Sequence, residues 1–275
     1  MVKFRNKKSL GQNFIKDPQI LKKIASVANL DTQTDVLEIG VGSANLTTIL
    51  AKKAKRVLGF EVDLSLIPLL EKKLKNYHNV YINFNDVLKI DFNQEIKKNL
   101  PNSSNLIAVG NIPYYITSPI IHKLLESEIN FTKIILMVQK EVAQRIVASP
   151  KTNNYSVLSL YIQEFAQPKI SFYVNKNNFY PIPKVDSAVI TLDLKPNRLP
   201  SLQIKEEMKF IELAFSNRRK QLKNNLAHLT KSKEEQNIVS NILMDLFSNT
   251  KIRAQELSLL QYRNLISKFK EYKII

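Results

Sequence analysis

The order in which strand-like and helix-like segments follow one another limits the possible folds of this chain more than any other feature. Short runs rich in Val, Ile, Leu and Phe alternate with segments whose apolar residues recur at helical spacing. Such alternation predicts a parallel sheet with helices on both faces. The predicted strands are residues 36–39, 57–62, 80–84, 106–109 and 134–138, and helix-like spacing marks residues 43–54, 64–76 and 117–127.

The alternation stops after the fifth predicted strand. Residues 169–174 and 186–194 both look like strands, and the segment between them, 179–184, is punctuated by prolines rather than helical. Two strands joined in this way favour an antiparallel pair at one edge of the sheet. No strand pattern follows Pro196 and Pro200.

The last quarter of the chain has a different character. Residues 204–271 carry apolar positions at helical spacing and predict four helices. A chain of 275 residues with 44% hydrophobic content can bury one large core and a small satellite core. We therefore predict an α/β domain over residues 1–198, with a basic N-terminal arm, and a small all-helical domain over residues 199–275.

Composition excludes several classes of site. The chain has no cysteine, so disulfides, thiolate nucleophiles and Cys-ligated metals are excluded. His78, His122 and His228 are far apart and in no ligand spacing, and we predict no metal site. The charged N-terminus lacks the apolar core of a signal peptide, and no window approaches 18 uncharged apolar residues. We expect a soluble, cytoplasmic protein.

The charge of the chain points to a polyanionic partner. The net charge is +17, with an excess of Lys and Arg concentrated in residues 1–30 and 200–275. A solubilising surface in a lysine-rich proteome is the simpler explanation of a high positive charge. A basic arm combined with a basic terminal segment nevertheless favours nucleic acid as the partner.

Polar and flexible residues follow the first three predicted strands. Gly40 and Gly42 stand directly after the first strand, where glycine lets the backbone approach a ligand. A dinucleotide fingerprint would place a third glycine at Asn45, so a nicotinamide cofactor is disfavoured. Glu61 closes the second strand, where an acid can accept both hydroxyls of a ribose, and Asp86 closes the third, placed to accept from an adenine amine.

Each acid taken alone is more simply a helix cap than a ligand. Three ligand-suited groups at the carboxyl ends of successive strands are a less probable coincidence, because open α/β sheets bind ligands at that edge. The sequence therefore predicts a nucleoside ligand.

The segment Val109–Tyr115 ends an apolar run in Gly-Asn-Ile-Pro-Tyr-Tyr. A strand that meets Gly, Asn and Pro is often only stopping at a turn. Together with other motifs, however, this stretch resembles the ribosomal RNA adenine dimethyltransferase family from about residue 5 to residue 265. The motifs that carry the resemblance are Leu10–Ile15, Glu38–Gly42, Phe60–Asp63, Asn111–Tyr114, Gln139–Val142, Phe179–Val189 and Phe215–Lys220.

The resemblance implies a Rossmann-like class I methyltransferase sheet with an antiparallel edge pair, plus a small C-terminal all-helical domain. It also implies S-adenosylmethionine as cofactor. Asn13 and Ile15 would contact its methionine part, Gly40 would pass close to it, and Glu61 and Asp86 would hold its ribose and adenine. The full set of cofactor-binding residues expected from the resemblance is Asn13, Ile15, Gly40, Gly42, Glu61, Val62, Asp86 and Asn111.

The same resemblance assigns the catalytic residues to Asn111–Tyr114 and Phe179. The N6 lone pair of adenine is delocalised, and two acceptors aimed at its hydrogens would favour a pyramidal, nucleophilic nitrogen. We expect these acceptors to be the side-chain carbonyl of Asn111 and the main-chain carbonyl of Ile112. Pro113 holds the residue before it extended. Tyr114 would stack on the flipped base and Phe179 could close its other side.

The implied reaction is dimethylation of the N6 amines of two adjacent adenosines in the 3′-terminal hairpin of 16S rRNA, in an assembling small ribosomal subunit. Alternatives are a macrolide-resistance-type 23S rRNA methyltransferase and a ribosome-assembly factor with vestigial catalysis. A nicotinamide oxidoreductase is a distant third. We expect a monomer that grips RNA phosphates through its basic arm and a basic helix, with the residues Lys7, Lys8, Arg218, Arg219, Lys220 and Lys223.

Overall fold

The computed structural model describes residues 13–196, 199 and 201–275, and these residues form two compact units. The first unit contains the described residues up to Ala143 together with Gln167–Pro196. The second contains Gln144–Ala166 and the described residues from Leu199 onward. The domain boundary predicted at residue 198 is two residues after Pro196, where the last segment of the first unit ends. An earlier excursion, Gln144–Ala166, joins the C-terminal helices although its sequence position placed it in the first domain.

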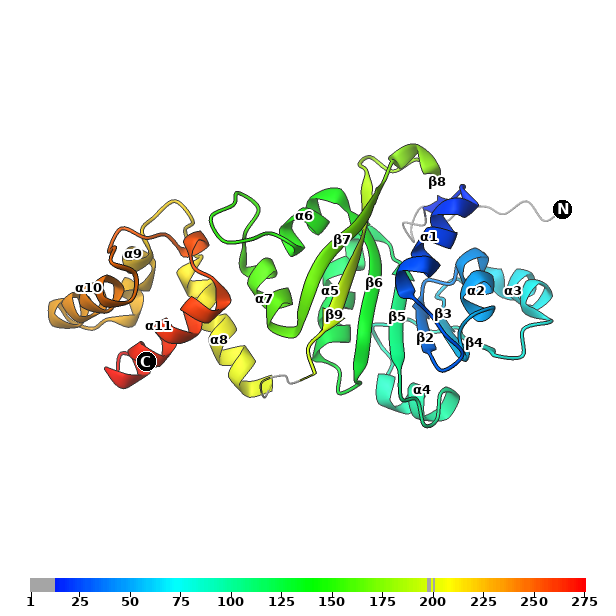
Figure 1. The fold of residues 1–275 in the computed structure, drawn as a ribbon, viewed down its shortest axis with the longest axis horizontal. Coiled ribbons are helices and arrows are strands. Elements are labelled where there is room, and N and C mark those ends of the chain that lie inside the picture. Colours follow the sequence, from blue (N-terminus) through cyan, green and yellow to red (C-terminus); the bar gives the residue numbers. More distant parts are fainter. Residues whose placement is uncertain (1–12, 197–198, 200) are drawn as a thin grey trace. The chain divides into compact units, whose positions relative to one another are not determined.

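The first unit is built on a seven-stranded sheet with the order β4-β3-β2-β5-β6-β9-β7 (Figure 1). Strands β2, β3, β4, β5 and β6 are parallel to one another, and β9 runs antiparallel to β6. The predicted parallel sheet and its antiparallel edge are confirmed. The strands of this sheet are β2 (Asp35–Ile39), β3 (Arg56–Phe60), β4 (Val80–Asn83), β5 (Leu106–Asn111), β6 (Phe131–Gln139), β7 (Ala166–Val174) and β9 (Ser187–Leu194).

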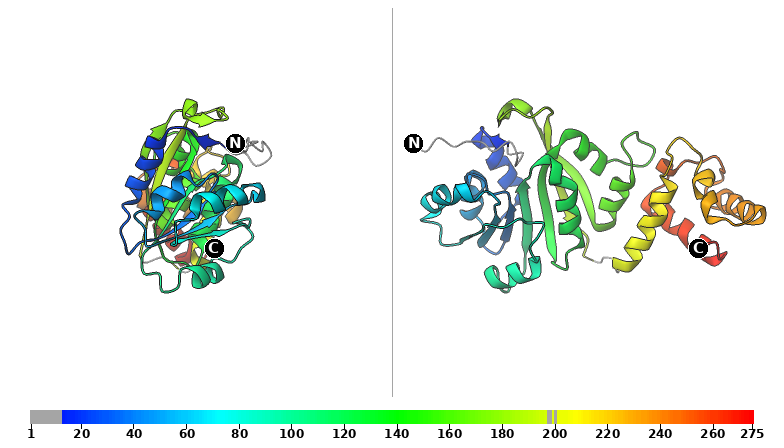
Figure 2. Two further views of the ribbon diagram at one scale, coloured as in Figure 1. Left: turned by 90° about the vertical axis from the view of Figure 1, so that its right-hand side faces the viewer. Right: turned by 180° about the vertical axis from the view of Figure 1, so that it is seen from behind.

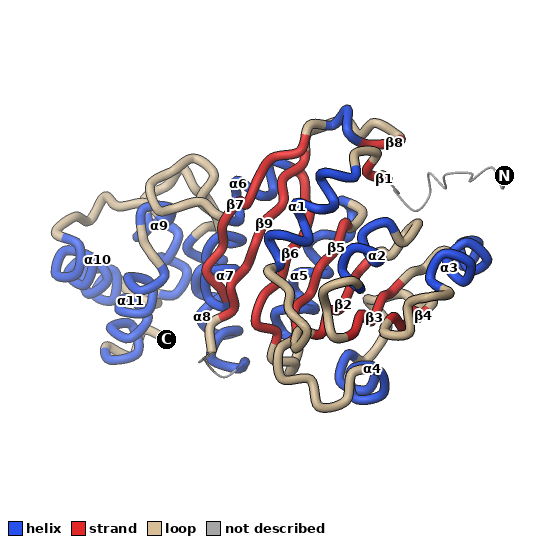
Figure 3. The backbone as a smooth tube through the Cα atoms, turned by 45° about the vertical axis from the view of Figure 1, so that its right-hand side comes forward, coloured by secondary structure: helices blue, strands red, loops and turns tan. Residues whose placement is uncertain are grey.

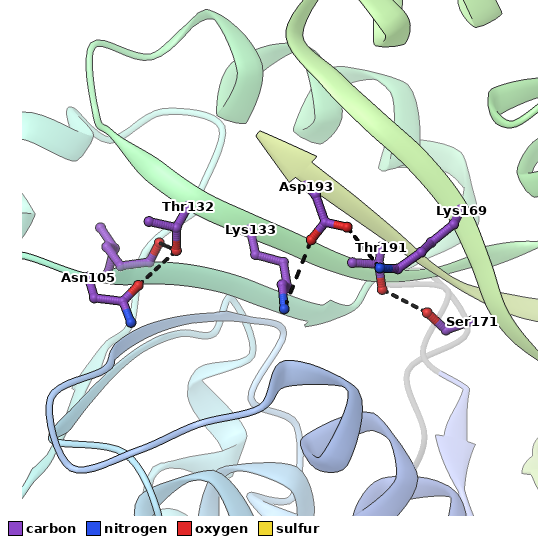
Figure 4. Close-up of polar contacts among 8 residues, drawn as sticks. Asn105, Thr132, Lys133, Lys169, Ser171, Thr191 and Asp193 are labelled. Atoms are coloured by element: carbon purple, nitrogen blue, oxygen red, sulfur yellow. Dashed lines mark hydrogen bonds and ion pairs between the residues drawn. The ribbon is translucent and has the colours of Figure 1, made fainter. Parts of the chain in front are cut away.

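Polar side chains link the strands at the antiparallel end of the sheet (Figure 4). Asp193 of β9 is paired with Lys133 of β6 in the strand register, and its carboxylate also accepts from Lys169 Nζ of β7 at 2.8 Å. The hydroxyls of Ser171 in β7 and Thr191 in β9 are 2.7 Å apart. These contacts tie β7 to β9, so the two strands expected to be neighbours lie side by side.

Apolar faces of the helices cover both sides of the sheet. Leu21 and Ile24 of α1 and Leu50 of α2 share one core with sheet residues such as Val109. On the opposite face, the ring of Phe92 in α4 contacts Phe60 and Phe131 edge-on. The view from behind in Figure 2 shows α5 on that opposite face. The helices of this unit are α1 (Pro18–Ala28), α2 (Asn45–Ala51), α3 (Ile67–Leu74), α4 (Phe92–Asn99) and α5 (Thr117–Glu126), and α6 (Lys140–Ile146) leads into the second unit.

A second, two-stranded sheet was not expected from the sequence. It pairs β1 (Phe14–Ile15) with β8 (Phe179–Tyr180) in antiparallel register, Phe14 opposite Tyr180 and Ile15 opposite Phe179. Two residues carry no detectable periodicity, so only the long-range pairing reveals these strands. The pairing places the start of the described chain next to the segment that precedes β9.

The second unit is helical, as Figure 3 shows by colour. Its helices are α7 (Val157–Phe165), α8 (Ser201–Ala214), α9 (Leu222–Leu226), α10 (Lys233–Phe247) and α11 (Leu259–Glu271), so residues 204–271 contain the four predicted helices. Ser232 and Ser258 cap α10 and α11 by accepting from backbone N–H groups of the first turn. No helix in the described part of the chain has both the length and the apolar character needed to cross a membrane.

Candidate active site

A pocket of about 350 Å³ opens at the carboxyl ends of the parallel strands in the first unit. This is the edge where open α/β sheets bind ligands, and the volume is that of a small-molecule site. Most of the predicted site residues border it. Those that line it are Asn13, Ile15, Gly40, Gly42, Glu61, Val62, Asp86, Asn111, Ile112, Pro113 and Tyr114.

The turn after β2 brings backbone to the surface of the pocket. Gly40 and Gly42 have φ values of 79° and 55°, a region that side chains strongly disfavour. A Cβ atom on Gly40 would lie 3.3 Å from the main-chain carbonyl oxygen of Asn111. Asn45, where a dinucleotide fold would have glycine, instead accepts a hydrogen bond from Lys73 Nζ, which also donates to the Ser43 carbonyl at 2.8 Å. Lys73 therefore holds the turn in place from α3.

Glu61 joins the ends of two neighbouring strands. Its carboxylate is 6% exposed and accepts from the backbone N–H groups of Gly42 at 2.7 Å, Val62 at 2.8 Å and Asp63 at 2.9 Å. Three N–H donors stabilise a carboxylate and fix its orientation. Glu61 thus organises the glycine turn as well as bordering the pocket, a structural role that its position at a strand end did not reveal.

Asp86 follows β4 and lies half-buried at the pocket. Its Oδ1 accepts from the N–H of Leu88 at 3.0 Å, which is the hydrogen bond of an Asx turn. Lys123 Nζ of α5 donates to the carbonyls of Leu88 at 2.9 Å and Ile90 at 2.7 Å. The loop that carries Asp86 is therefore held by its own Asx turn and by Lys123.

Asn111 is the last residue of β5, and its amide is anchored. Its Nδ2 donates to the main-chain carbonyl of Asn13 at 3.2 Å. Because an amide has its donors and its acceptor on opposite sides, this bond determines which way Oδ1 points. The residue expected to bind the cofactor and the residue expected to act on the substrate are thus joined directly.

The three residues after Asn111 turn away from the strand. Ile112 is buried, and Pro113 has φ −57° and ψ 138° before a short 3₁₀ turn that begins at Tyr114. The hydroxyl of Tyr114 lies 2.6 Å from Oγ of Ser187, a fully buried residue at the start of β9. Burial raises the pKa of Tyr114, an effect that Asp186 adds to. The ring of Tyr114 is therefore fixed at both ends.

Phe179 is the predicted site residue that the structure does not bring into the pocket. It is 1% exposed and belongs to the core shared with Ile15. Successive side chains of a strand point to opposite faces, so β8 buries Phe179 and leaves Tyr180 outside. In this structure the ring of Phe179 has no face open to a base.

Glu38 is a pocket residue for which the sequence predicted no role, although it begins the motif Glu38–Gly42. Glu38 is 1% exposed, lines the pocket, and its Oε2 has no hydrogen-bond partner among the described residues. Burial raises its pKa to about 8, and the nearby Glu61 adds to the shift. An acid inside the apolar run Val36–Ile39 was the signal that could have identified it.

The basic residues of the second unit lie on a turn, not on the expected helix. Arg218, Arg219 and Lys220 are exposed between α8 and α9, and Lys223 is half-buried in α9. Asn225 Nδ2 donates to the carbonyls at the end of α8 and in this turn, which ends the helix before the basic residues. Arg218 also donates to a carbonyl of the 149–154 loop at 3.0 Å. Lys7 and Lys8 lie outside the described residues.

The sheet order, the glycine turn and the Asn-Ile-Pro-Tyr segment at the pocket define a Rossmann-like methyltransferase. Comparisons with known proteins agree. A model of the family described as ribosomal RNA adenine dimethylase matches residues 3–265. A protein named ribosomal RNA small subunit methyltransferase A from Mycoplasmopsis synoviae is 49% identical over 216 residues, covering 78% of this chain and 80% of its own length.

A protein of the same name from Streptococcus pneumoniae is 38% identical, covering 97% of this chain and 93% of its own length. The crystal structure of a dimethyladenosine transferase from Plasmodium falciparum superimposes with a TM-score of 0.79 at 27% identity, covering 94% of this chain and 98% of that one. The chain belongs to the ribosomal RNA adenine dimethylase family.

Proposed function

We propose that this protein transfers methyl groups from S-adenosylmethionine to the N6 amines of two adjacent adenosines in the 3′-terminal hairpin of small-subunit rRNA. Two relatives at 49% and 38% identity are named ribosomal RNA small subunit methyltransferase A, which supports the substrate class. The observation that carries the proposal is the anchored amide of Asn111 at the edge of the pocket. Two methyl groups are transferred to each amine.

The pocket fits the cofactor. Gly40 and Gly42 keep the floor of the pocket free of side chains, and Glu61 and Asp86 present carboxylates at the ends of β3 and β4. These residues would hold the ribose and adenine, and Asn13 and Ile15 the methionine part. When bound, S-adenosylmethionine supplies an electrophilic methyl group on a sulfonium.

Asn111 activates the target amine. With Nδ2 donating to Asn13, Oδ1 remains as the acceptor for one N6 hydrogen, and the main-chain carbonyl of Ile112 accepts the other. Two acceptors favour a pyramidal nitrogen whose lone pair can attack. Pro113 keeps the Ile112 backbone extended and so aims its carbonyl. No general base is needed before attack, and the surplus proton leaves to water afterwards.

Tyr114 provides a face for the adenine that leaves the RNA stack. Its hydroxyl is bound by Ser187, so the ring cannot rotate away from the pocket. Stacking on an aromatic side chain is the usual way in which a flipped base is held. Phe179 could close the other side of the base only if β8 moved, because its ring is buried in the core.

Two alternatives differ from this proposal. A macrolide-resistance-type enzyme would methylate large-subunit rRNA, and the names of the two relatives favour the small subunit. An assembly factor with vestigial catalysis would be expected to have an altered tetrapeptide, whereas Asn111–Tyr114 is intact and lines the pocket. Assembly and methylation can nevertheless coexist in one protein.

We further propose that the substrate is the partly assembled small subunit, that the protein acts as a monomer, and that it works in the cytoplasm. The exposed Arg218, Arg219 and Lys220 would contact phosphates there, with Lys223 and the N-terminal Lys7 and Lys8 as additional cations. Mass spectrometry of rRNA from cells with and without the gene tests the function. Loss of N6-dimethyladenine from small-subunit rRNA is expected, and its loss from large-subunit rRNA would contradict the proposal.

Replacing Asn111 with Ala separates chemistry from cofactor binding. We expect methyl transfer to fall by about 10²-fold or more, the size found when one preorganised hydrogen-bonding group of an active site is removed. Calorimetry should show the cofactor dissociation constant raised only moderately. Asn85→Ala, at another asparagine of the same pocket, is the matched control and should retain most activity. Turnover of N111A within a few-fold of wild type would remove the acceptor role.

A further inference from the structure

Two tyrosines beside the pocket expose most of their surface. Tyr115 lines the pocket and is 65% exposed, and Tyr180 is 66% exposed. Among the described residues of the first unit they are the most exposed large apolar side chains. An exposed aromatic ring is costly in water and in many proteins indicates a binding surface.

Tyr115 lines the pocket itself, and strand register places Tyr180 beside Phe14, another lining residue. Tyr180 is paired with Phe14 in the β1–β8 sheet, so the two side chains share one face, opposite the buried Phe179. Phe14 lines the pocket, and its ring would be 3.2 Å from a Cβ on Gly42. The face of the small sheet that carries Phe14 and Tyr180 therefore reaches the pocket at Phe14.

The second link runs through Tyr114. Its hydroxyl binds Ser187, which brings the residues just before β9 next to Tyr114 and Tyr115. In this segment Ile182 is 58% exposed and Val185 is 44% exposed. Tyr115, Tyr180, Ile182 and Val185, here called the apolar rim, thus come from two segments that the Tyr114–Ser187 contact joins.

We propose that the apolar rim binds the nucleotide next to the target adenine, with Tyr115 and Tyr180 stacking on its base. This inference rests on the proposed function, because it takes single-stranded RNA as the substrate. When one adenine enters the pocket, its neighbour is pulled out of its own stack and presents an apolar face to water. An aromatic side chain offers the replacement stack, and such contacts accept any base.

The rim suits two successive substrates. In a pair of adjacent adenines, each base is in turn the target and the neighbour. A surface that binds by stacking alone tolerates the change between an unmodified and a dimethylated amine, because it does not read the N6 group. The rim therefore binds one adenine while the other is methylated in the pocket, whichever of the two is modified first.

The test uses small ribosomal subunits isolated from cells that lack this gene. We expect Tyr180→Ala and Tyr115→Ala each to raise the KM for the subunit by about 5- to 150-fold, the range for loss of one base–aromatic stack. Tyr180→Phe and Tyr115→Phe retain the ring and should behave like wild type. The affinity for S-adenosylmethionine, measured by calorimetry, should not change in Y180A, which distinguishes a lost RNA contact from a distorted pocket.

Two controls make the outcome decisive. Tyr81→Ala removes an exposed tyrosine from β4, at the far edge of the sheet, and should not alter the KM. Subunits with uridine, which stacks weakly, in place of the neighbouring adenine should raise the KM of the wild type but change that of Y180A much less.

The proposal is overturned if the alanine variants methylate subunits like wild type, or if the Phe variants are impaired as much as the Ala variants. Wild-type protein that methylates no subunit would instead contradict the proposed function. The two failures are therefore distinguishable.

Discussion

A single carboxylate, Glu61, borders the proposed cofactor site and also organises the backbone of that site. It receives the N–H groups of Gly42, Val62 and Asp63, and so connects the end of β3 to the turn after β2. A residue whose charge is stabilised by backbone donors is already oriented when a ribose arrives, and little reorganisation is needed. Replacing Glu61 should weaken binding of the cofactor much more than binding of the RNA.

Glu61→Ala should raise the cofactor dissociation constant at least tenfold. Two ribose hydroxyls lose a charged acceptor, and hydrogen bonds to a charged group contribute roughly 1.5–3 kcal/mol each. Glu61→Gln keeps the shape of the side chain but replaces one acceptor oxygen with an NH2 donor that faces the N–H of Gly42 or Val62. We therefore expect its loss of cofactor affinity to be smaller than that of E61A. Calorimetry with S-adenosylmethionine measures both variants, and an unchanged affinity of E61A would exclude Glu61 from the site.

Glu38 makes stability depend on pH. Burial holds its folded-state pKa at about 8 against an ordinary value of 4.5, so the folded protein retains a proton that the unfolded chain releases. Its contribution to stability is therefore complete below pH 4.5 and is lost as the pH rises to 8. The slope is up to about 1.4 kcal/mol of unfolding free energy per pH unit.

Glu38→Gln should flatten this dependence, because glutamine stays neutral throughout. Urea unfolding at pH 5, 6.5 and 8 measures the difference between variant and wild type. Glu71→Gln, at an exposed carboxylate of α3, should leave the slope unchanged. Equal slopes for E38Q and wild type would show that Glu38 is ionised in the folded protein at neutral pH.

One ion-pair network joins three helices of the second unit. Arg263 of α11 binds Glu164 of α7, and its Nε donates to Glu207 of α8 at 3.1 Å. Both glutamates are buried, Glu164 at 3% and Glu207 at 6% exposure of the residue. Because α7 comes from the excursion Gln144–Ala166, this network holds the excursion to helices that lie far along the chain.

Arg263→Met should destabilise the protein by about 3–5 kcal/mol, since it leaves two buried carboxylates without their cation. The change is measured as the free energy of unfolding in urea at pH 7. The triple variant R263M/E164Q/E207Q removes the charges together and should recover most of the loss. A single variant as stable as wild type would mean that the network contributes nothing.

For the whole molecule, we expect the distribution of charge to determine how strongly it binds RNA. The chain has a net charge of +17, and the exposed turn with Arg218, Arg219 and Lys220 is one place where it is concentrated. Phosphate contacts release counterions, which makes RNA binding depend on salt. A short RNA could engage only part of the basic surface, so efficient methylation is expected for the assembling subunit and poor methylation for short oligonucleotides.

Replacing Arg218, Arg219 and Lys220 with Ala should reduce the salt slope of subunit binding by about two to three units, somewhat under one per lost phosphate contact. Methylation of the subunit should slow, with the affinity for S-adenosylmethionine unchanged. Binding is measured at several salt concentrations.

A control with the same loss of charge keeps this test specific. Lys52, Lys53 and Lys97 are exposed in the first unit, and their replacement with Ala should reduce the slope less. If both triple variants behave alike, only the net charge matters and the turn is a solvated surface.

The local pattern of strands and helices and the type of sheet could be determined from the sequence alone. The alternation of strands and helices predicted the parallel sheet, and the residues that end its strands, such as Glu61 and Asp86, were expected at one edge. This works because hydrophobic periodicity and strand termini are local properties, and parallel strands bring their carboxyl ends together. Four helices in residues 204–271 followed from the same periodicity.

Only the tertiary structure decided features that depend on residues far apart in the chain. The β1–β8 pairing, the turn at Arg218 and the grouping of Gln144–Ala166 with the C-terminal helices all depend on distant partners. The clearest case is Phe179, expected to face the base, which is buried while Tyr180 is exposed. Which neighbour of a two-residue strand points inward is set by the core it packs on, and local sequence does not contain that information.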